Sequence, residues 1–113
     1  MKITNGSIAV IGSSILVNAF KFVGIDKYIV IEDRREIDKL RDEIEKIFED
    51  KEVTVIVIED FISPHIKDII EQFKYKITPI IVELPSPANI KAHDPKEYYK
   101  SRARKVLGVS IEV

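Results

Sequence analysis

Cysteine is absent from this chain of 113 residues. Its absence excludes a disulfide framework, a thiolate zinc site and a cysteine nucleophile, and the cytosol is the simplest compartment for such a protein. The two histidines, His65 and His93, stand apart in the sequence without a cluster of other ligand residues around them. We therefore expect surface histidines and no metal site.

Long apolar runs are also missing. No run approaches the roughly 18 residues of a membrane-spanning helix, and no basic stretch followed by an apolar stretch opens the chain. We expect no direct membrane insertion, so any work at a membrane would depend on binding another protein. Hydrophobic residues make up 45% of the chain and charged residues 33%, which indicates one globular domain and argues against disorder.

Motifs that carry catalytic chemistry are missing as well. The chain has neither of the glycine-rich patterns GxGxxG and GxxxxGKS/T, and it lacks the GxSxG pattern of a serine nucleophile. The turn Gly12–Ser14 could hold an anion at a helix N-terminus, which would make the protein a small-ligand binder. We favour a plain glycine turn with a serine cap. We expect no catalytic residue, no cofactor and no tight nucleotide binding.

Four short runs rich in valine and isoleucine alternate with amphipathic helical patterns. The runs are Ser7–Ile11, Lys27–Ile31, Val53–Ile58 and Pro79–Leu84. Runs that are almost continuously apolar are typical of parallel strands covered on both faces. Alternation of strands and helices with short links predicts an α/β fold with a four-stranded parallel doubly wound sheet. We expect a receiver-like or flavodoxin-like sheet in the order 2-1-3-4, with helices on both faces.

Helix start signals precede three of the helical patterns. Asp33 with Glu36 predicts a capping box for the second helix. Ser63–Pro64 predicts an N-cap followed by a first-turn proline for the third helix, and Asp94–Pro95 repeats that signal for a fourth. The chain therefore reads as strand and helix in alternation, four times over.

The last helix differs from the rest of the chain in charge. Residues 1–90 hold 12 Lys or Arg against 16 Asp or Glu, a net −4, whereas residues 91–107 hold six against two, a net +4. We divide the chain into a receiver-like domain (1–84), a proline-containing linker (85–94) and a basic C-terminal helix with its tail (95–113). Because the linker is long and proline favours extended backbone, we expect a semi-detached helix that hinges near Pro85–Pro95.

The C-terminal helix supplies the candidate partner-binding residues. Its basic ridge has a spacing of four residues, and a thin apolar stripe runs beside it. The candidates are Lys96, Tyr99, Lys100, Arg104, Val106 and Leu107. The acidic domain beneath argues against nucleic acid, and a protein with an acidic surface fits better. A solvated helix face remains the simpler alternative.

Asp60 follows the third strand, where a receiver domain carries its phosphate-accepting aspartate. That chemistry also needs an acidic pair after the first strand to hold Mg²⁺, and this chain has Ser13-Ser14 there. We therefore expect Asp60 to be a solvated turn residue and Glu32-Asp33 to be a helix cap. A receiver-like signalling or phosphotransfer protein remains the alternative function.

Five segments of the chain together resemble a known family. They are SIAVIGS (Ser7–Ser13), AFKFVGI (Ala19–Ile25), VIVIED (Val55–Asp60), ITPIIVELPSP (Ile77–Pro87) and ARKVLGVSI (Ala103–Ile111). The chain is similar, nearly end to end, to the F subunit of the archaeal-type (A-type/V-type) rotary ATP synthase. The ITPIIVELP and AFKFVG segments are the more specific parts of the resemblance.

The resemblance implies a non-catalytic component of the central rotor stalk. It implies a receiver-like domain bound to the coiled-coil D subunit, with a mobile C-terminal helix that reaches the nucleotide-binding A and B subunits. Such a component helps to couple or regulate ATP synthesis or hydrolysis and ion transport. It would lie at the cytoplasmic side of the cell membrane as a peripheral part of the complex. The linker PSPANIKAHDP (residues 85–95) is longer than the short archaeal pattern.

Overall fold

The computed structural model describes residues 7–91 and 94–111. Its strands are β1 (Ser7–Gly12), β2 (Lys27–Val30), β3 (Val53–Glu59) and β4 (Ile80–Leu84). Its α-helices are α1 (Ser14–Phe22), α2 (Arg41–Glu49), α3 (Lys67–Phe73) and α4 (Pro95–Ile111). Three short 3₁₀ helices are η1 (Arg34–Glu36), η2 (Ser63–Ile66) and η3 (Pro87–Asn89).

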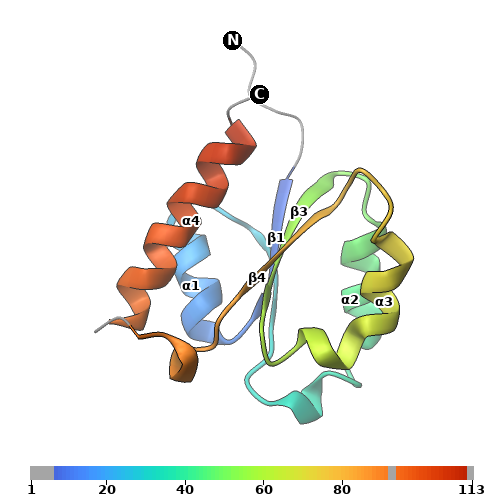
Figure 1. The fold of residues 1–113 in the computed structure, drawn as a ribbon, viewed down its shortest axis with the longest axis horizontal. Helices are drawn as coiled ribbons and strands as arrows, with labels where there is room; N and C mark the ends of the chain where they lie inside the picture. Colours follow the sequence, from blue (N-terminus) through green and yellow to red (C-terminus); the bar gives the residue numbers. More distant parts are fainter. Residues whose placement is uncertain (1–6, 92–93, 112–113) are drawn as a thin grey trace.

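The four strands form one parallel sheet in the order β2-β1-β3-β4, which confirms the predicted order and fold class. The central strands are nearly all buried because helices cover both of their faces. The pair α1 and α4 covers one face, and the pair α2 and α3 covers the other (Figure 1). The C-terminal ends of all four strands therefore meet at one edge, which we call the carboxyl edge.

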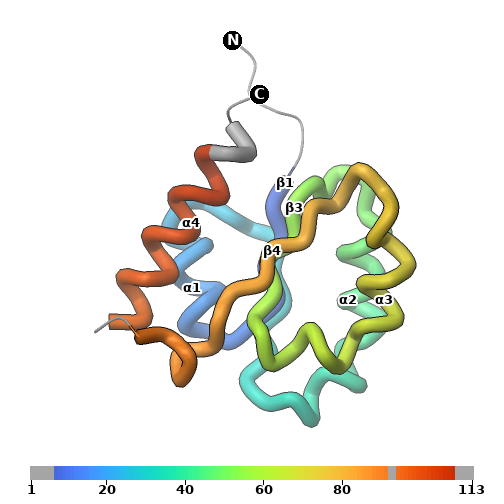
Figure 2. Tube along the Cα trace, in the orientation of Figure 1, coloured from blue at the N-terminus to red at the C-terminus, as the bar shows by residue number. Residues whose placement is uncertain are grey.

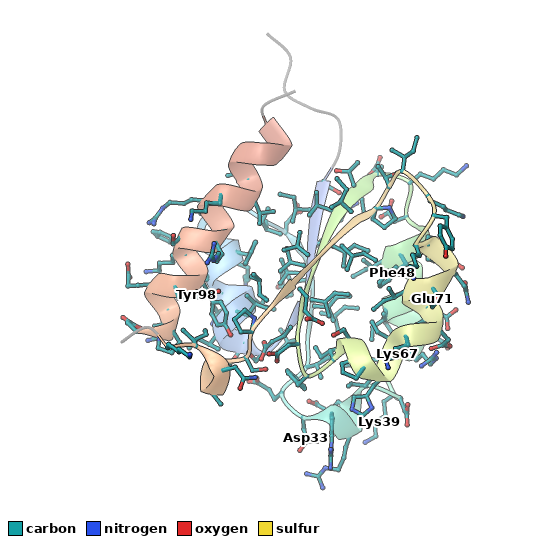
Figure 3. The ribbon with its side chains drawn as sticks, in the orientation of Figure 1. Asp33, Lys39, Phe48, Lys67, Glu71 and Tyr98 are labelled. Carbon is teal, nitrogen blue, oxygen red and sulfur yellow. The ribbon has the colours of Figure 1, made fainter. Side chains whose placement is uncertain are left out.

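Alternate residues of β1, β3 and β4 feed two separate cores. The core towards α2 and α3 contains Ile11, Ile44, Phe48, Ile58 and Ile66, among other buried residues. The core towards α1 and α4 contains Val10, Leu16, Phe20, Val57, Leu84, Tyr99 and Ala103. Figure 3 labels one aromatic residue on each side, Phe48 and Tyr98.

Two predicted helix starts differ from the structure. Asp33 and Glu36 do form a capping box, but it begins the short helix η1, and α2 starts only at Arg41. The prediction of Ser63 as an N-cap is wrong, because its hydroxyl donates to the Glu83 carboxylate on β4 instead. The Ser63 hydroxyl therefore donates to a distant side chain and does not accept from a local backbone N–H as an N-cap would.

The helix α4 is packed against the domain, so the expectation of a semi-detached helix needs correction for this structure. Tyr99 and Ala103 are both 0% exposed, and Val106 and Leu107 pack against the same core. The predicted apolar stripe is thus the contact face of α4. At its start, the Asp94 carboxylate accepts a hydrogen bond of 3.0 Å from the Lys96 backbone N–H, as the Asp94–Pro95 signal predicts.

Candidate functional site

The last residue of β1, Gly12, lies so close to α1 and β3 that it has no room for a side chain. A Cβ on Gly12 would lie 2.6 Å from Cδ2 of Leu16 and 2.9 Å from Oε1 of Glu59. Glycine is required here for this close approach. The turn brings the N-terminus of α1 directly beside the buried Glu59 carboxylate.

Two carboxylates of the chain occupy the donors at the N-terminus of α1. Oε1 of Glu59 accepts hydrogen bonds from the Ser13 backbone N–H (2.9 Å) and the Ser13 hydroxyl (2.7 Å). Glu32 accepts from the Ser14 backbone N–H (3.1 Å) and the Ser14 hydroxyl (2.8 Å). A bound phosphate would use these same donors. The internal carboxylates take the place of an anion, which argues against the small-ligand interpretation of this turn.

Asp60 connects the end of β3 to the linker that follows β4. Its carboxylate accepts hydrogen bonds from the Ser86 hydroxyl and from Nδ2 of Asn89 (3.0 Å), and its backbone N–H donates to the Leu84 carbonyl (2.8 Å). Burial acts to raise the pKa of Asp60, but the bonds from Ser86 and Asn89 outweigh it and hold the pKa below its ordinary value. Asp60 lies in a turn, as predicted, but it is half-buried and anchors the linker, whereas a freely solvated side chain was expected.

Tyr99 fastens α4 to the same linker. Its hydroxyl donates a hydrogen bond of 2.6 Å to the Pro85 carbonyl. Burial, together with the negative charges of Glu59 and Asp60, raises the pKa of Tyr99. The phenol therefore stays neutral and keeps the proton that this bond needs. Residues 84–89 and α4 are thus held at the carboxyl edge by specific hydrogen bonds, which no local sequence pattern indicates.

The structure divides the six predicted partner-binding residues into two groups. Tyr99, Val106 and Leu107 face the core, and Tyr99 is inaccessible while α4 is docked. Lys96 and Lys100 line a groove between α4 and α1, whereas Arg104 is exposed. The predicted basic ridge is therefore on the surface of the docked helix, and the predicted apolar stripe is beneath it.

The groove between α1 and α4 combines an apolar floor with two lysines. Ile15, Ala19 and Phe22 of α1 form its floor. Nζ of Lys100 lies 4.7 Å from the centroid of the Phe22 ring and 3.7 Å from a Glu97 carboxylate oxygen. The cation thus has an aromatic face on one side and a carboxylate on the other.

The remaining candidate residues form no reactive cluster. His65 is exposed in η2, and His93 lies outside the described residues. Within residues 7–91 and 94–111, no three His, Asp or Glu side chains gather as a metal site would require. In that same part of the chain, no helix has both the length and the apolar character to cross a bilayer.

Comparison with known proteins agrees with the resemblance seen in the sequence. Residues 8–102 match the family model of the ATP synthase (F/14-kDa) subunit. No curated protein sequence matches this chain at a significant level.

Among solved structures, the chain is similar to the F subunit of the V-type ATP synthase from Archaeoglobus fulgidus. The TM-score is 0.58 at 18% sequence identity, and the match covers 72% of this chain and 99% of that chain. At this identity the likeness shows a shared fold. The family model matches most of the chain, and it confirms the resemblance seen in the sequence: this chain belongs to the ATP synthase (F/14-kDa) subunit family.

Proposed function

We propose that this protein is the non-catalytic F subunit in the central rotor stalk of an A-type/V-type ATP synthase. There it binds the coiled-coil D subunit and helps to couple or regulate ATP synthesis or hydrolysis and ion transport. The family match over residues 8–102 carries this proposal. As part of that complex, the protein works at the cytoplasmic side of the cell membrane without entering the bilayer.

The carboxyl edge of the sheet supports a non-catalytic role. In doubly wound folds this edge is the usual place for chemistry. Here the donors at the start of α1 are taken by Glu32 and Glu59, and Asp60 is bound by two residues of the linker. The groups that would bind a phosphate or accept a phosphoryl group instead hold the structure together.

The receiver-like alternative has a direct test. A phosphotransfer protein would form an acyl phosphate on Asp60 when incubated with acetyl phosphate and Mg²⁺. Because the Asp60 carboxylate accepts bonds from Ser86 and Asn89, we expect the intact mass to stay unchanged. A stable adduct that disappears in an Asp60→Asn variant would restore the signalling function.

The helix α4 is the proposed contact with the nucleotide-binding A and B subunits. It presents Lys96 and Arg104 to solvent, while Tyr99 and Ala103 hold it on the domain. Acidic surfaces on a partner would attract the basic side, and release of α4 would expose its apolar face for a second set of contacts. The helix then exchanges between a docked and a released position that differ by a few kcal/mol, roughly the range of a ligand-driven switch.

The main test is binding to the coiled-coil D subunit. Purified protein is titrated with the D subunit of the same complex and followed by calorimetry and size-exclusion chromatography. We expect a stable equimolar complex. Absence of any complex at micromolar concentrations would refute the proposed function.

The contribution of α4 has a separate test. Replacing Lys96, Lys100 and Arg104 by Glu should leave thermal unfolding nearly unchanged, because charges at the surface, including the pair of Lys100 with Glu97, contribute about 1 kcal/mol or less each. ATP hydrolysis by the assembled complex should nevertheless change at low salt, and the difference should shrink as salt screens the charges. An unchanged rate at low salt would leave the basic side of α4 without a role in regulation.

A further inference from the structure

The two most exposed large apolar side chains of the described residues lie beside β4, together with a third exposed one. Ile77 is 93% exposed, Tyr75 is 89% exposed and Ile80 is 54% exposed. Tyr75 and Ile77 lie in the short segment that joins α3 to β4, and Ile80 begins β4, at the end of the sheet away from the linker (Figure 2). Single exposed apolar residues are ordinary, but three large ones within six residues form a patch of the kind that marks an interaction site.

This patch continues into a groove between β4 and α4. Val55, Ile80 and Val82 line the groove from the sheet, and Tyr98 and Val106 line it from α4. In the four-stranded sheet β4 is an edge strand, so Ile80 and Val82 have neighbours on only one side. Ile80 belongs both to this exposed segment and to the groove, so it joins the two apolar surfaces.

Cations surround this apolar surface. Lys74 and Lys76 flank Tyr75 in the sequence, and Arg102 and Lys105 of α4 line the groove. Three of these cations lie over aromatic rings, and Nζ of Lys74 is 5.7 Å from the Tyr75 ring centroid. Nζ of Lys76 lies 4.9 Å from the Phe73 ring centroid, and the Arg102 guanidinium lies 5.0 Å from the Tyr98 ring centroid.

Carboxylates balance these cations in part. Lys76 lines a separate groove at α2 and α3 together with Glu49 and Asp50. In the groove between β4 and α4 the acidic residue is Glu83, whose carboxylate accepts a hydrogen bond from Ser63 near α3. Lys74 has a partner in Glu71 at 3.5 Å on the exposed side of α3. The surface is apolar in its centre and basic at its rim, and it is complementary to a partner with apolar and acidic residues on one side. We call the set Lys74, Tyr75, Lys76, Ile77, Ile80, Arg102 and Lys105 the β4 surface.

The edge of β4 is a poor template for an added strand. The strand has five residues, and the prolines Pro79 and Pro85 next to its ends have no N–H to donate. The Leu84 carbonyl accepts from Asp60, so Leu84 faces β3 and only the alternate residues Ile81 and Glu83 direct N–H and C=O outward. Recognition here must depend on side chains, as when an amphipathic helix lies in a groove.

We infer that the β4 surface docks an acidic amphipathic helix of another protein of the complex. The inference rests on the proposed function, because it places a stalk or catalytic component on this surface. The apolar stripe of the partner helix packs over Ile80 and Val106, with Tyr75 and Ile77 as anchors at one end. Its acidic residues meet the two lysines of the loop and the two cations of α4. This surface stays available while α4 is docked.

The test is rebinding to the ATP synthase complex from which this protein has been removed. The test variant carries Tyr75→Ser, Ile77→Ser and Ile80→Thr. The matched control carries Tyr28→Thr and Val30→Thr on β2, the opposite edge of the sheet, where both residues are 39% exposed. Because all five side chains are exposed, each variant should melt close to the wild type. We expect at least a tenfold weaker rebinding for the test variant and wild-type rebinding for the control.

A charge variant tests the nature of the partner. Lys74→Glu, Lys76→Glu and Lys105→Glu together should weaken rebinding strongly at low salt and much less at high salt. Rebinding that does not respond to these changes would overturn the acidic partner.

Three further outcomes would also overturn the inference about the β4 surface. Wild-type rebinding by the patch variant would overturn the inference and leave the proposed function intact, whereas no rebinding by the wild type would overturn both. A wild-type homodimer in solution that the patch variant abolishes would assign the surface to a second copy of this chain, which would also overturn the inference.

Discussion

The two faces of the sheet are covered in different ways. On one face, α2 and α3 each follow a strand and precede the next strand. Their contact is mainly apolar, with the Phe48 and Phe73 rings 5.5 Å apart, and Arg41 of α2 forms an ion pair with Asp68 of α3 at the surface. On the other face, α4 arrives after the linker and is held by polar groups as well. Tyr99 donates to Pro85, and Asp60 binds the linker through Ser86 and Asn89.

This difference indicates that one face mainly stabilises the fold, whereas the other also determines the position of α4. The α2–α3 face depends mainly on hydrophobic burial, which is strong but has little directionality, because its Arg41–Asp68 ion pair lies at the surface. The α1–α4 face adds hydrogen bonds, each of which contributes about 1 kcal/mol net but only at one geometry. A few such bonds determine where α4 lies. Loss of these bonds would change the position of α4 before the domain unfolded. That arrangement is suited to the docked and released positions proposed for α4.

Deletion of α4 is the most severe test of the difference between the two faces of the sheet. We expect a chain truncated after Pro87 to unfold cooperatively still, because four strands and three helices remain packed. Its stability should fall by at least the roughly 3–5 kcal/mol that truncating one buried aromatic residue costs, because Val57 and Leu84 lose the cover of Tyr99. Calorimetry and urea unfolding measure both quantities. Loss of cooperative unfolding would make α4 part of one indivisible core and refute the predicted boundary at residue 84.

Removal of the Tyr99 hydroxyl tests the same difference between the two faces with a smaller change. Tyr99→Phe keeps the buried ring but removes the bond to the Pro85 carbonyl, which should cost about 1 kcal/mol. The loss should appear as faster amide exchange in α4, with α2 and α3 unchanged. Tyr98→Phe on the adjacent, half-buried tyrosine is the control. Equal acceleration in α2 and α3 would show that the two faces respond as one unit.

The smallest expected effect is a dependence of the linker anchor on pH. Because the folded-state pKa of Asp60 is lowered, its contribution to stability is complete above the unfolded-state value of about 4 and disappears as the pH falls through the folded-state value. The wild type should therefore exceed Asp60→Asn in urea midpoint at pH 7, and the difference should shrink as the pH is lowered to about 3. Asp26→Asn, in the exposed loop before β2, is the control. A difference that persists unchanged in acid would show that the charge of Asp60 does not hold the linker.

The sequence by itself determined the sheet and the contact face of α4. Each of the four apolar runs became a strand at nearly the predicted residues, because a run rich in valine and isoleucine is itself a local strand pattern. The expected continuous burial holds for β1 and β3, whereas β2 and β4 are partly exposed at the edges of the sheet. The strand order followed from short right-handed connections. The stripe containing Tyr99 and Ala103 was also visible, because helical spacing alone puts these residues on one side.

The tertiary structure alone decided what the polar residues do. Ser13 and Glu59 are 46 positions apart, and Asp60 and Asn89 are 29 apart, so no local spacing reveals either pair. A carboxylate after a strand has the same local sequence whether it faces solvent, an ion or a serine from another loop. Its partner is fixed only when the strands align in register and bring their C-terminal ends together. For the same physical reason, the apolar residues beside β4 were recognisable as a strand start, but their exposure depended on which strand lies at the edge.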